Sequence, residues 1–182
     1  MTDVQRAWRF LEESDPIASA QEVQAALARV AAQISERLAT SYPLVLAVMG
    51  GAVIFAGQIL PLLHFPLDFD YIHASRYGAE TRGARVDWRV TPPAAARGRA
   101  VLVLDDILDG GDTMAAIRDR LIELGAASFH CAVLVEKILR RPKPIAADFV
   151  GLRIEDRFVF GYGMDAKGYW RNLPEIRAMR GN

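Results

Sequence analysis

The chain has 182 residues, of which 52% are hydrophobic and 24% are charged, the composition of an ordinary globular domain. Lys plus Arg and Asp plus Glu both number 22, and this zero net charge argues against a general nucleic-acid binder, which would carry a basic excess. There is no signal-peptide pattern and no apolar run near the roughly 18 residues of a membrane span. Together with a single cysteine, Cys131, these features predict one domain in the cytoplasm, with neither nucleic-acid nor membrane partners.

Apolar periodicity predicts helices and strands that alternate along the chain. SAQE (19–22) has the spacing of a capping box, and apolar residues then recur at steps of three and four up to about Thr40. Apolar runs and period-two alternation indicate the strands. In chain order we predict a helix over 19–40, a strand over 44–49, a helix over 52–63, strands over 67–77, 84–90 and 100–106, a helix over 111–124, strands over 129–137 and 148–154, and strand and loop from Phe158.

This alternation predicts an α/β fold around a mostly parallel sheet. Ligands of such sheets bind at the carboxyl ends of the strands. Three predicted strand ends carry unusual residues, namely Gly50-Gly51, the segment 105–113, and Glu136-Lys137. We therefore expect these three segments to form one site.

The most informative segment is VLVLDDILDGGDTM (101–114). A glycine turn that leads into a helix favours a bound phosphate, because the free N–H groups and the helix dipole attract anions. The adjacent carboxylates of Asp105 and Asp106 suit sugar hydroxyls or a hard cation such as Mg²⁺. The segment alone predicts a sugar-phosphate site, although each acid taken singly also fits a turn, a helix cap or a solvated strand end.

VLVLDDILDGGDTM resembles the phosphoribosyl-pyrophosphate (PRPP) motif of type I phosphoribosyltransferases. FVFGYGMDAKGYWRNLPEI (158–176) resembles the C-terminal block of the hypoxanthine-guanine branch, and VEK (135–137) resembles the segment that carries its purine-reading lysine. These motifs occur in the family's order between about Pro43 and Met179. The resemblance implies the type I phosphoribosyltransferase fold, a mostly parallel sheet flanked by helices with a small hood.

The resemblance also implies the organisation of the chain. A single phosphoribosyltransferase domain would cover 1–182, with a core over about 43–137. The hood would come from the N-terminal helix region and from the segment 138–182. The N-terminal 40 residues carry a helix but no motif, and we expect them to serve in packing or in an interface. The family suggests a homodimer or homotetramer.

The activity implied is purine salvage. Ribose 5-phosphate would pass from PRPP to a ring nitrogen of a 6-oxopurine base, hypoxanthine and/or guanine, giving the nucleotides IMP or GMP and pyrophosphate, with Mg²⁺ as cofactor. Asp109 would exchange a proton with the purine N7, and Lys137 would donate to the 6-oxo group. Phe158 would stack on the base, and Val159 would contact its edge through backbone groups.

The other candidate residues would bind the rest of PRPP. They are Asp105 and Asp106 for the ribose and the metal, Asp165 for the metal, the segment Asp109, Gly110, Gly111, Asp112 and Thr113 for the 5′-phosphate, Gly50, Gly51 and Arg171 for pyrophosphate, and Ser75 and Tyr77 for a mobile lid.

Several positions depart from the family pattern. Gly50 stands where many relatives have a lysine, Gly110 where a hydroxyl residue is common, and Ala166 where an aromatic residue often follows the metal-binding aspartate. Asp112 lies beside the expected phosphate, where an acid is unfavourable unless it points outward, so the motif gives it no role. None of these departures removes a group that the chemistry needs.

Three alternatives remain at this point. One is an enzyme that prefers xanthine or uses hypoxanthine alone. Another is a regulatory protein of the same fold that binds PRPP or a nucleotide, which the joint presence of Asp109, Lys137 and Asp165 disfavours, since a binder needs no general acid or base. A phosphate-accepting receiver domain would have neither Lys137 nor the C-terminal block.

Overall fold

The computed structural model describes residues 1–76 and 86–181. Its larger sheet has the strand order β4-β3-β2-β5-β6-β7, in which all neighbours are parallel except β3 and β4. The strands are β2 (Leu44–Val48), β3 (Asp68–Arg76), β4 (Val86–Val90), β5 (Ala100–Leu108), β6 (Ser128–Ile138) and β7 (Phe149–Glu155). The predicted α/β fold with a mostly parallel sheet is confirmed.

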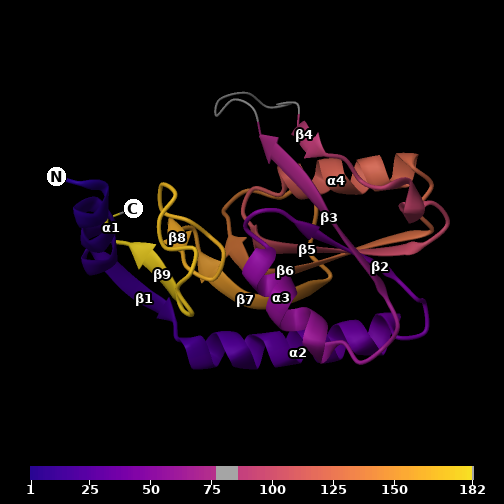
Figure 1. Ribbon diagram of the computed structural model, residues 1–182, viewed down its shortest axis with the longest axis horizontal. Coiled ribbons are helices and arrows are strands. Elements are labelled where there is room, and N and C mark those ends of the chain that lie inside the picture. Colours follow the sequence, from indigo (N-terminus) through magenta and orange to yellow (C-terminus); the bar gives the residue numbers. More distant parts are fainter. Residues whose placement is uncertain (77–85, 182) are drawn as a thin grey trace.

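Helices cover both faces of this sheet. The helices α2 (Ala20–Leu38) and α3 (Val53–Ile59) lie on one face and α4 (Asp112–Glu123) on the other (Figure 1). Successive residues of β2 alternate between the two sides: Val45 and Ala47 belong to the core beneath α2 and α3, and Leu44 and Leu46 to the core beneath α4. Burial on both faces explains why the central strands read as continuous apolar runs.

Local sequence signals set the limits of the helices. Ser19 caps α2 as predicted, because its side chain accepts a hydrogen bond from the Glu22 N–H and the Glu22 carboxylate accepts from the Ser19 N–H. The helix expected over 52–63 is shorter, since α3 ends at Ile59 and the 3₁₀ helix η1 (Leu60–Leu62) follows. Pro61 has no N–H with which to continue the α-helix. Within the described ranges, no helix has both the length and the apolar character of a bilayer span.

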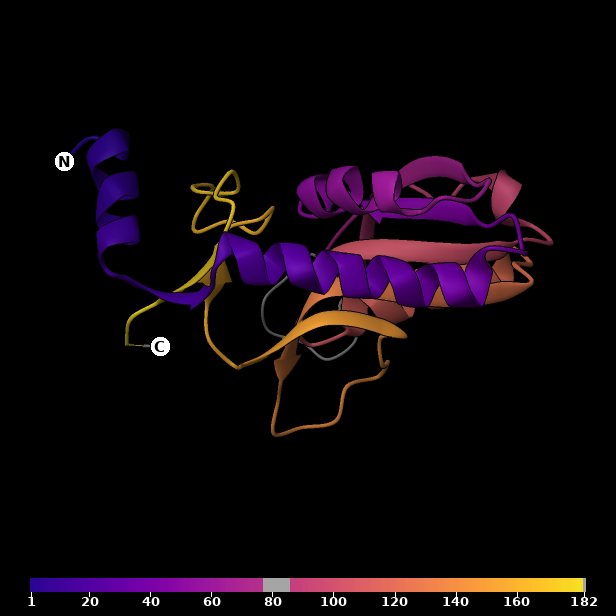
Figure 2. The same cartoon turned by 90° about the horizontal axis from the view of Figure 1, so that it is seen from below.

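A second, smaller sheet forms the hood. Its strands run in the order β1-β9-β8 and are antiparallel: β1 (Ser14–Ala18), β9 (Ile176–Met179) and β8 (Val159–Phe160). The helix α1 (Asp3–Glu12) stands beside this sheet, at the end of the molecule away from the core (Figure 2). It buries none of its residues and is held by Trp170, whose Nε1 donates to the carbonyl of Ala7 at 2.6 Å and whose ring contacts Trp8 edge-on.

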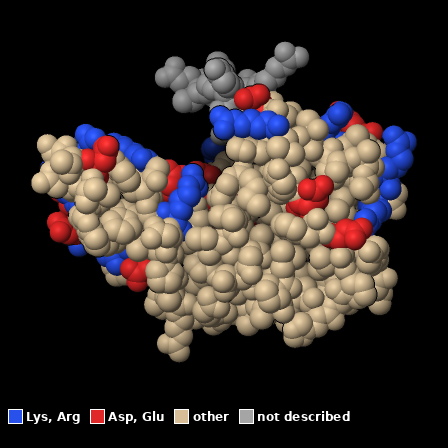
Figure 3. Space-filling model, in the orientation of Figure 1, with Lys and Arg blue, Asp and Glu red and all other residues tan. Residues whose placement is uncertain are grey.

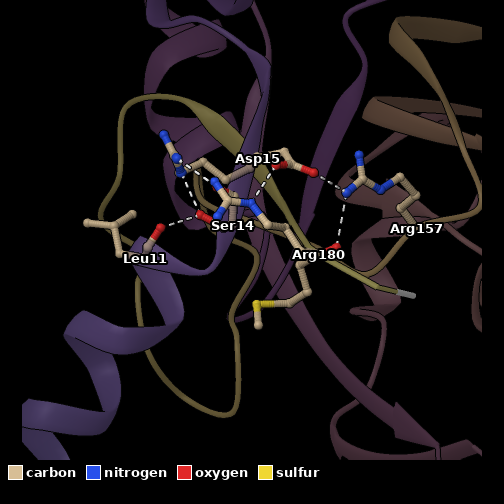
Figure 4. A network of polar contacts seen from close by, with 7 residues as sticks. Leu11, Ser14, Asp15, Arg157 and Arg180 are labelled. Atoms are coloured by element: carbon tan, nitrogen blue, oxygen red, sulfur yellow. Dashed lines mark hydrogen bonds and ion pairs between the residues drawn. The ribbon is translucent and has the colours of Figure 1, made fainter.

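Ion pairs brace the hood next to one of the predicted base-binding residues. Asp15 in β1 accepts hydrogen bonds from Arg157 and Arg180, both at 2.8 Å, and Arg157 also donates to the carbonyl of Met179 (Figure 4). The N–H of Met179 donates in turn to the carbonyl of Phe158. Arg157 directly precedes Phe158, and Met179 hydrogen-bonds the Phe158 carbonyl. Both residues are held to β1, Arg157 through Asp15 and Met179 through its pairing with Ser14.

The core extends further along the chain than the sequence suggested. The strand β7 is the edge strand of the larger sheet, and α2 packs on that sheet, although the expected core covered only about 43–137. Phe149 of β7 is buried in the core cluster that includes α2. In the structure the C-terminal part of the hood begins after Glu155 rather than near residue 138.

Candidate active site

The carboxyl ends of β2, β5, β6 and β7 meet at one edge of the parallel sheet, facing the hood. A hollow with acidic and basic side chains separates the hood from the core on this side (Figure 3). A pocket of about 410 Å³ opens here, and its lining includes Gly51, the segment 105–114, Arg141 and Arg171. The structure thus brings the predicted pyrophosphate and phosphate segments together at the end of the sheet.

Asp105 and Asp106 follow the fully buried residues 101–104 of β5. Burial raises the pKa of both carboxyls, and the negative charge of Asp106 raises the pKa of Asp105 further. The nearby Arg171 guanidinium offsets part of the rise at Asp106. Since both pKa values are higher in the folded protein, the ionised pair weakens the fold as the pH rises through them. A cation or sugar hydroxyl donors at this position would relieve that cost.

The glycine turn leads directly into α4. Gly111 is its N-cap residue with φ +88°, a left-handed conformation that favours glycine, and it offers no capping side chain. The first N–H groups of α4 therefore lack a side-chain acceptor at the cap and face the pocket lined by Gly110, Gly111 and Thr113. This geometry suits an anion such as a phosphate.

A second cavity, of about 200 Å³, lies between the sheet and the hood. Its lining comprises Asp106, Ile107, Asp109, Lys137, Phe158, Val159, Met164 and Asp165. The Lys137 side chain is only 11% exposed, and its Nζ lies 3.1 Å from Asp109 Oδ2 and 3.4 Å from Asp156 Oδ1. The predicted base-binding residues thus line one cavity, and Asp109 belongs to both this cavity and the 410 Å³ pocket.

Asp165 and Arg171, the two predicted site residues of the C-terminal block that carry a charge, pair with each other. Arg171 Nη2 lies 2.6 Å from Asp165 Oδ1, and Asp165 Oδ2 accepts from the Gly168 N–H. Arg171 Nη1 also donates to the carbonyl of Gly163, and this hood residue lies directly against Gly51. The hood and the predicted pyrophosphate loop are therefore in contact.

The predicted lid lies largely outside the described residues. Ser75 is near the end of β3, where its backbone is paired with Asp87 of β4. Tyr77 belongs to the segment 77–85, which the structure does not describe. The lid therefore remains a prediction.

Comparison with known proteins identifies the family. A family model described as a phosphoribosyl transferase domain matches residues 13–167. The chain belongs to this family. It is 29% identical to the hypoxanthine-guanine phosphoribosyltransferase of Bacillus subtilis, over 89% of the chain and 91% of the relative. It is 31% identical to the hypoxanthine-guanine-xanthine phosphoribosyltransferase of Tritrichomonas foetus, over 87% of each protein.

A solved structure of the same family shows the same fold. The hypoxanthine-guanine phosphoribosyltransferase of Bacillus anthracis superposes with a TM-score of 0.82 and 28% sequence identity, over 90% of this chain and 96% of that one. The resemblance inferred from the three sequence motifs is thereby confirmed.

Sequence reasoning missed several residues of this phosphoribosyltransferase site. Asp156 pairs with Lys137, Met164 lines the smaller cavity, and Arg141 lines the larger pocket. The only signal for Arg141 was the basic composition of LRRPKP (139–144), which by itself indicates an exposed turn. Asp156 follows β7 directly, so its position could have been suspected once that strand was placed in the sheet.

Gly51→Ala is expected to damage the site through a steric clash. A Cβ atom at position 51 would lie 2.0 Å from Oδ2 of the buried Asp106, so the loop or the carboxylate has to move. We expect weaker PRPP binding and a free energy of unfolding lower by about 1–3 kcal/mol, the usual cost of overpacking. Chemical denaturation and PRPP titration measure the two effects.

Gly57→Ala is the matched control, because a Cβ at that position in α3 meets no atom within 4 Å. It should leave PRPP binding unchanged and stability equal or higher, as alanine favours helix over glycine. Equal behaviour of the two variants would contradict the close approach of Gly51 to Asp106.

Proposed function

We propose that the chain transfers ribose 5-phosphate from PRPP to hypoxanthine or guanine and releases pyrophosphate, as an enzyme of purine salvage. The observation that carries this proposal is the position of Asp109. It lines both the cavity with Lys137 and Phe158 and the pocket with the glycine turn and the Asp105–Asp106 pair. A purine and a ribose phosphate bound in these two spaces would meet at Asp109.

Lys137 and Phe158 select and hold the base. The ammonium of Lys137 has only donors, so it hydrogen-bonds a 6-oxo group but cannot accept from a 6-amino group. The ring of Phe158, which is 41% exposed, offers a face for stacking beside Lys137. Backbone groups of Val159 contact the edge of the purine, and the ion pairs around Asp15 keep this segment in place.

Asp109 moves the proton of the base. One of its oxygens, Oδ2, accepts from Lys137, while Oδ1 has no hydrogen-bond partner in the described ranges. Asp109 exchanges a proton with the purine N7 through this carboxylate, a general acid/base step that keeps the base reactive as its other ring nitrogen attacks the ribose. Lys137 beside it keeps the carboxylate oriented toward the base.

The residues of the larger pocket hold PRPP. Asp105 and Asp106 bind the ribose hydroxyls, and the 5′-phosphate lies on the turn from Asp109 to Thr113. Gly50 and Gly51 offer backbone N–H groups to the pyrophosphate, and Arg171 supplies a planar cation for its oxygens. Ser75 and Tyr77 are the proposed lid residues, which exclude the water that competes with the purine.

The acidic pair also fits a Mg²⁺ ion. In the part of the chain that the structure describes, no three His, Cys, Asp or Glu side chains gather into a ready-made metal site. Mg²⁺ typically uses one or two carboxylates and completes its shell with water and substrate phosphates. Asp105 and Asp106, with Asp165 nearby, would hold the ion together with PRPP, and the ion would offset negative charge on the leaving pyrophosphate.

Two further proposals concern the cellular location and the oligomeric state of the enzyme. We place it in the cytoplasm, supported by its single cysteine, which is buried and whose thiol pKa is raised by burial to about 12. We also propose a homodimer or homotetramer, which the family suggests; light scattering of the purified protein tests it.

The activity is tested by measuring pyrophosphate release with PRPP, Mg²⁺ and each of five bases: hypoxanthine, guanine, xanthine, adenine and uracil. We expect turnover with hypoxanthine and guanine and none with adenine or uracil, because Lys137 reads the 6-oxo group. The rate with xanthine decides whether the site prefers that base. Absence of turnover with every 6-oxopurine would refute the enzyme and favour the regulatory alternative.

A further inference from the structure

Arg141 reaches the phosphate turn from a different part of the chain. It belongs to the connection between β6 and β7, and it lines the 410 Å³ pocket together with Gly110, Gly111 and Thr113. Its Nη2 lies 3.1 Å from the position that a Cβ of Gly110 would occupy. The guanidinium therefore lies over the turn. It shares the space beside position 110 with the Asp112 carboxylate, whose Oδ2 lies 3.3 Å from the same Cβ position.

The connection that carries Arg141 is fixed to the site. Lys143 Nζ donates to the carbonyl of Leu108 at 3.0 Å and to the carbonyl of Lys137 at 2.6 Å, joining the ends of β5 and β6. Ile145 is buried, and its Cγ2 lies 3.3 Å from the Cβ position of Gly111. The backbone on which Arg141 sits is therefore anchored to the phosphate turn on one side and to the base-reading lysine on the other.

The phosphate turn, residues 109–113, contains no cationic side chain of its own. Gly110 has no hydroxyl to donate, and the first turn of α4 contains an acid rather than a base. Among the residues that the structure describes, Arg141 and Arg171 are the arginines that line the pocket, and Arg171 is already paired with Asp165. The guanidinium of Arg141 has no hydrogen bond or ion pair with any residue in 1–76 or 86–181.

We propose that Arg141 is a ligand of the 5′-phosphate, in PRPP and in the product nucleotide, and supplies the cation that the turn itself lacks. The inference rests on the proposed function. A guanidinium suits this role, since its planar donors match two phosphate oxygens and it stays charged at any physiological pH. The 5′-phosphate does not react, so Arg141 stabilises the ground state and the transition state alike, and its loss raises KM more than it lowers kcat.

The test compares Arg141→Gln with Arg140→Gln. Arg140 is the neighbouring arginine on the same connection and is also exposed. It lines a separate pocket beside Asp156, but not the 410 Å³ pocket that holds the phosphate turn. For Arg141→Gln we expect the Kd for IMP and the KM for PRPP to rise about 10- to 100-fold, the range of a hydrogen bond to a charged group. Inhibition by inosine, which has the base and ribose but no phosphate, should not change, and Arg140→Gln should match the wild type.

A second substitution separates this role from a structural one. Adding Gly110→Ser to the Arg141→Gln variant places a hydroxyl donor in the vacated space and should recover part of the IMP affinity. The proposal is overturned if Arg141→Gln binds IMP as tightly as Arg140→Gln, or if it loses inosine and IMP affinity equally. Both results presuppose an active wild type; a wild type that neither turns over PRPP nor binds IMP would instead overturn the proposed function, and this inference with it.

Discussion

Asp109→Asn is expected to lower kcat by roughly 10²–10⁴-fold, the contribution usual for a general acid/base. Asparagine keeps the shape of the side chain, and its carbonyl oxygen can still accept from Lys137, which lies 3.1 Å from the carboxylate in the structure. Its amide cannot exchange a proton with the purine N7. PRPP binding should persist, because the backbone of the turn and the acidic pair are unchanged. Steady-state kinetics with saturating hypoxanthine measure kcat, and PRPP titration measures the affinity for PRPP.

Asp156→Asn is the matched control for Asp109→Asn. Asp156 is the second carboxylate near Lys137, at 3.4 Å, but it does not line the cavity with Phe158 and Val159. Its loss removes a similar charge without removing the proton-exchanging group, so kcat should fall far less. Comparable kcat values for the two variants would show that charge near Lys137 matters and that Asp109 has no special chemical role.

Lys137→Met is expected to remove the discrimination between 6-oxo and 6-amino purines. The lysine is largely buried between two carboxylates, and methionine fills a similar volume without donors. We expect kcat/KM for hypoxanthine to fall by about 10²–10⁴-fold, because a site built to hydrogen-bond a substrate group discriminates through that bond. Part of the loss comes from leaving Asp109 and Asp156 without their shared cation.

Lys167→Met serves as the control for that substitution, since Lys167 is exposed in the hood and lies over the Phe10 ring. The quantity to compare is the ratio of kcat/KM for hypoxanthine to that for adenine. Lys167→Met should keep the wild-type ratio, and Lys137→Met should lower it strongly. An unchanged ratio in Lys137→Met would remove the lysine from base recognition.

Much of the core was predictable because its residues obey simple periodicities. The capping box at Ser19 and the three-and-four spacing after it gave α2, and the apolar run before Asp105 gave a strand buried on both faces. The acids and glycines after that strand could be assigned to a ligand site because the carboxyl end of a parallel strand is where such a sheet binds ligands.

The packing of the hood was not predictable from local pattern, although the capping box of Thr2 and Gln5 marks the start of α1. The helix α1 buries no residue, and it is fixed by Trp170 from the far end of the chain. Arg141 escaped notice for a related reason, since nothing in its neighbours indicates that Lys143 anchors the connection beside the phosphate turn. Both features depend on tertiary contacts between segments distant in sequence, which periodicity cannot reveal.

We propose that a single site joins the base cavity to the phosphate pocket at Asp109. A crystal structure of the complex with IMP tests it most directly. We expect the purine between Phe158 and the sheet with its 6-oxo group at Lys137 Nζ, the ribose hydroxyls at Asp105 and Asp106, and the phosphate on the turn 109–113. IMP bound elsewhere, or bound here with its phosphate away from that turn, would contradict it.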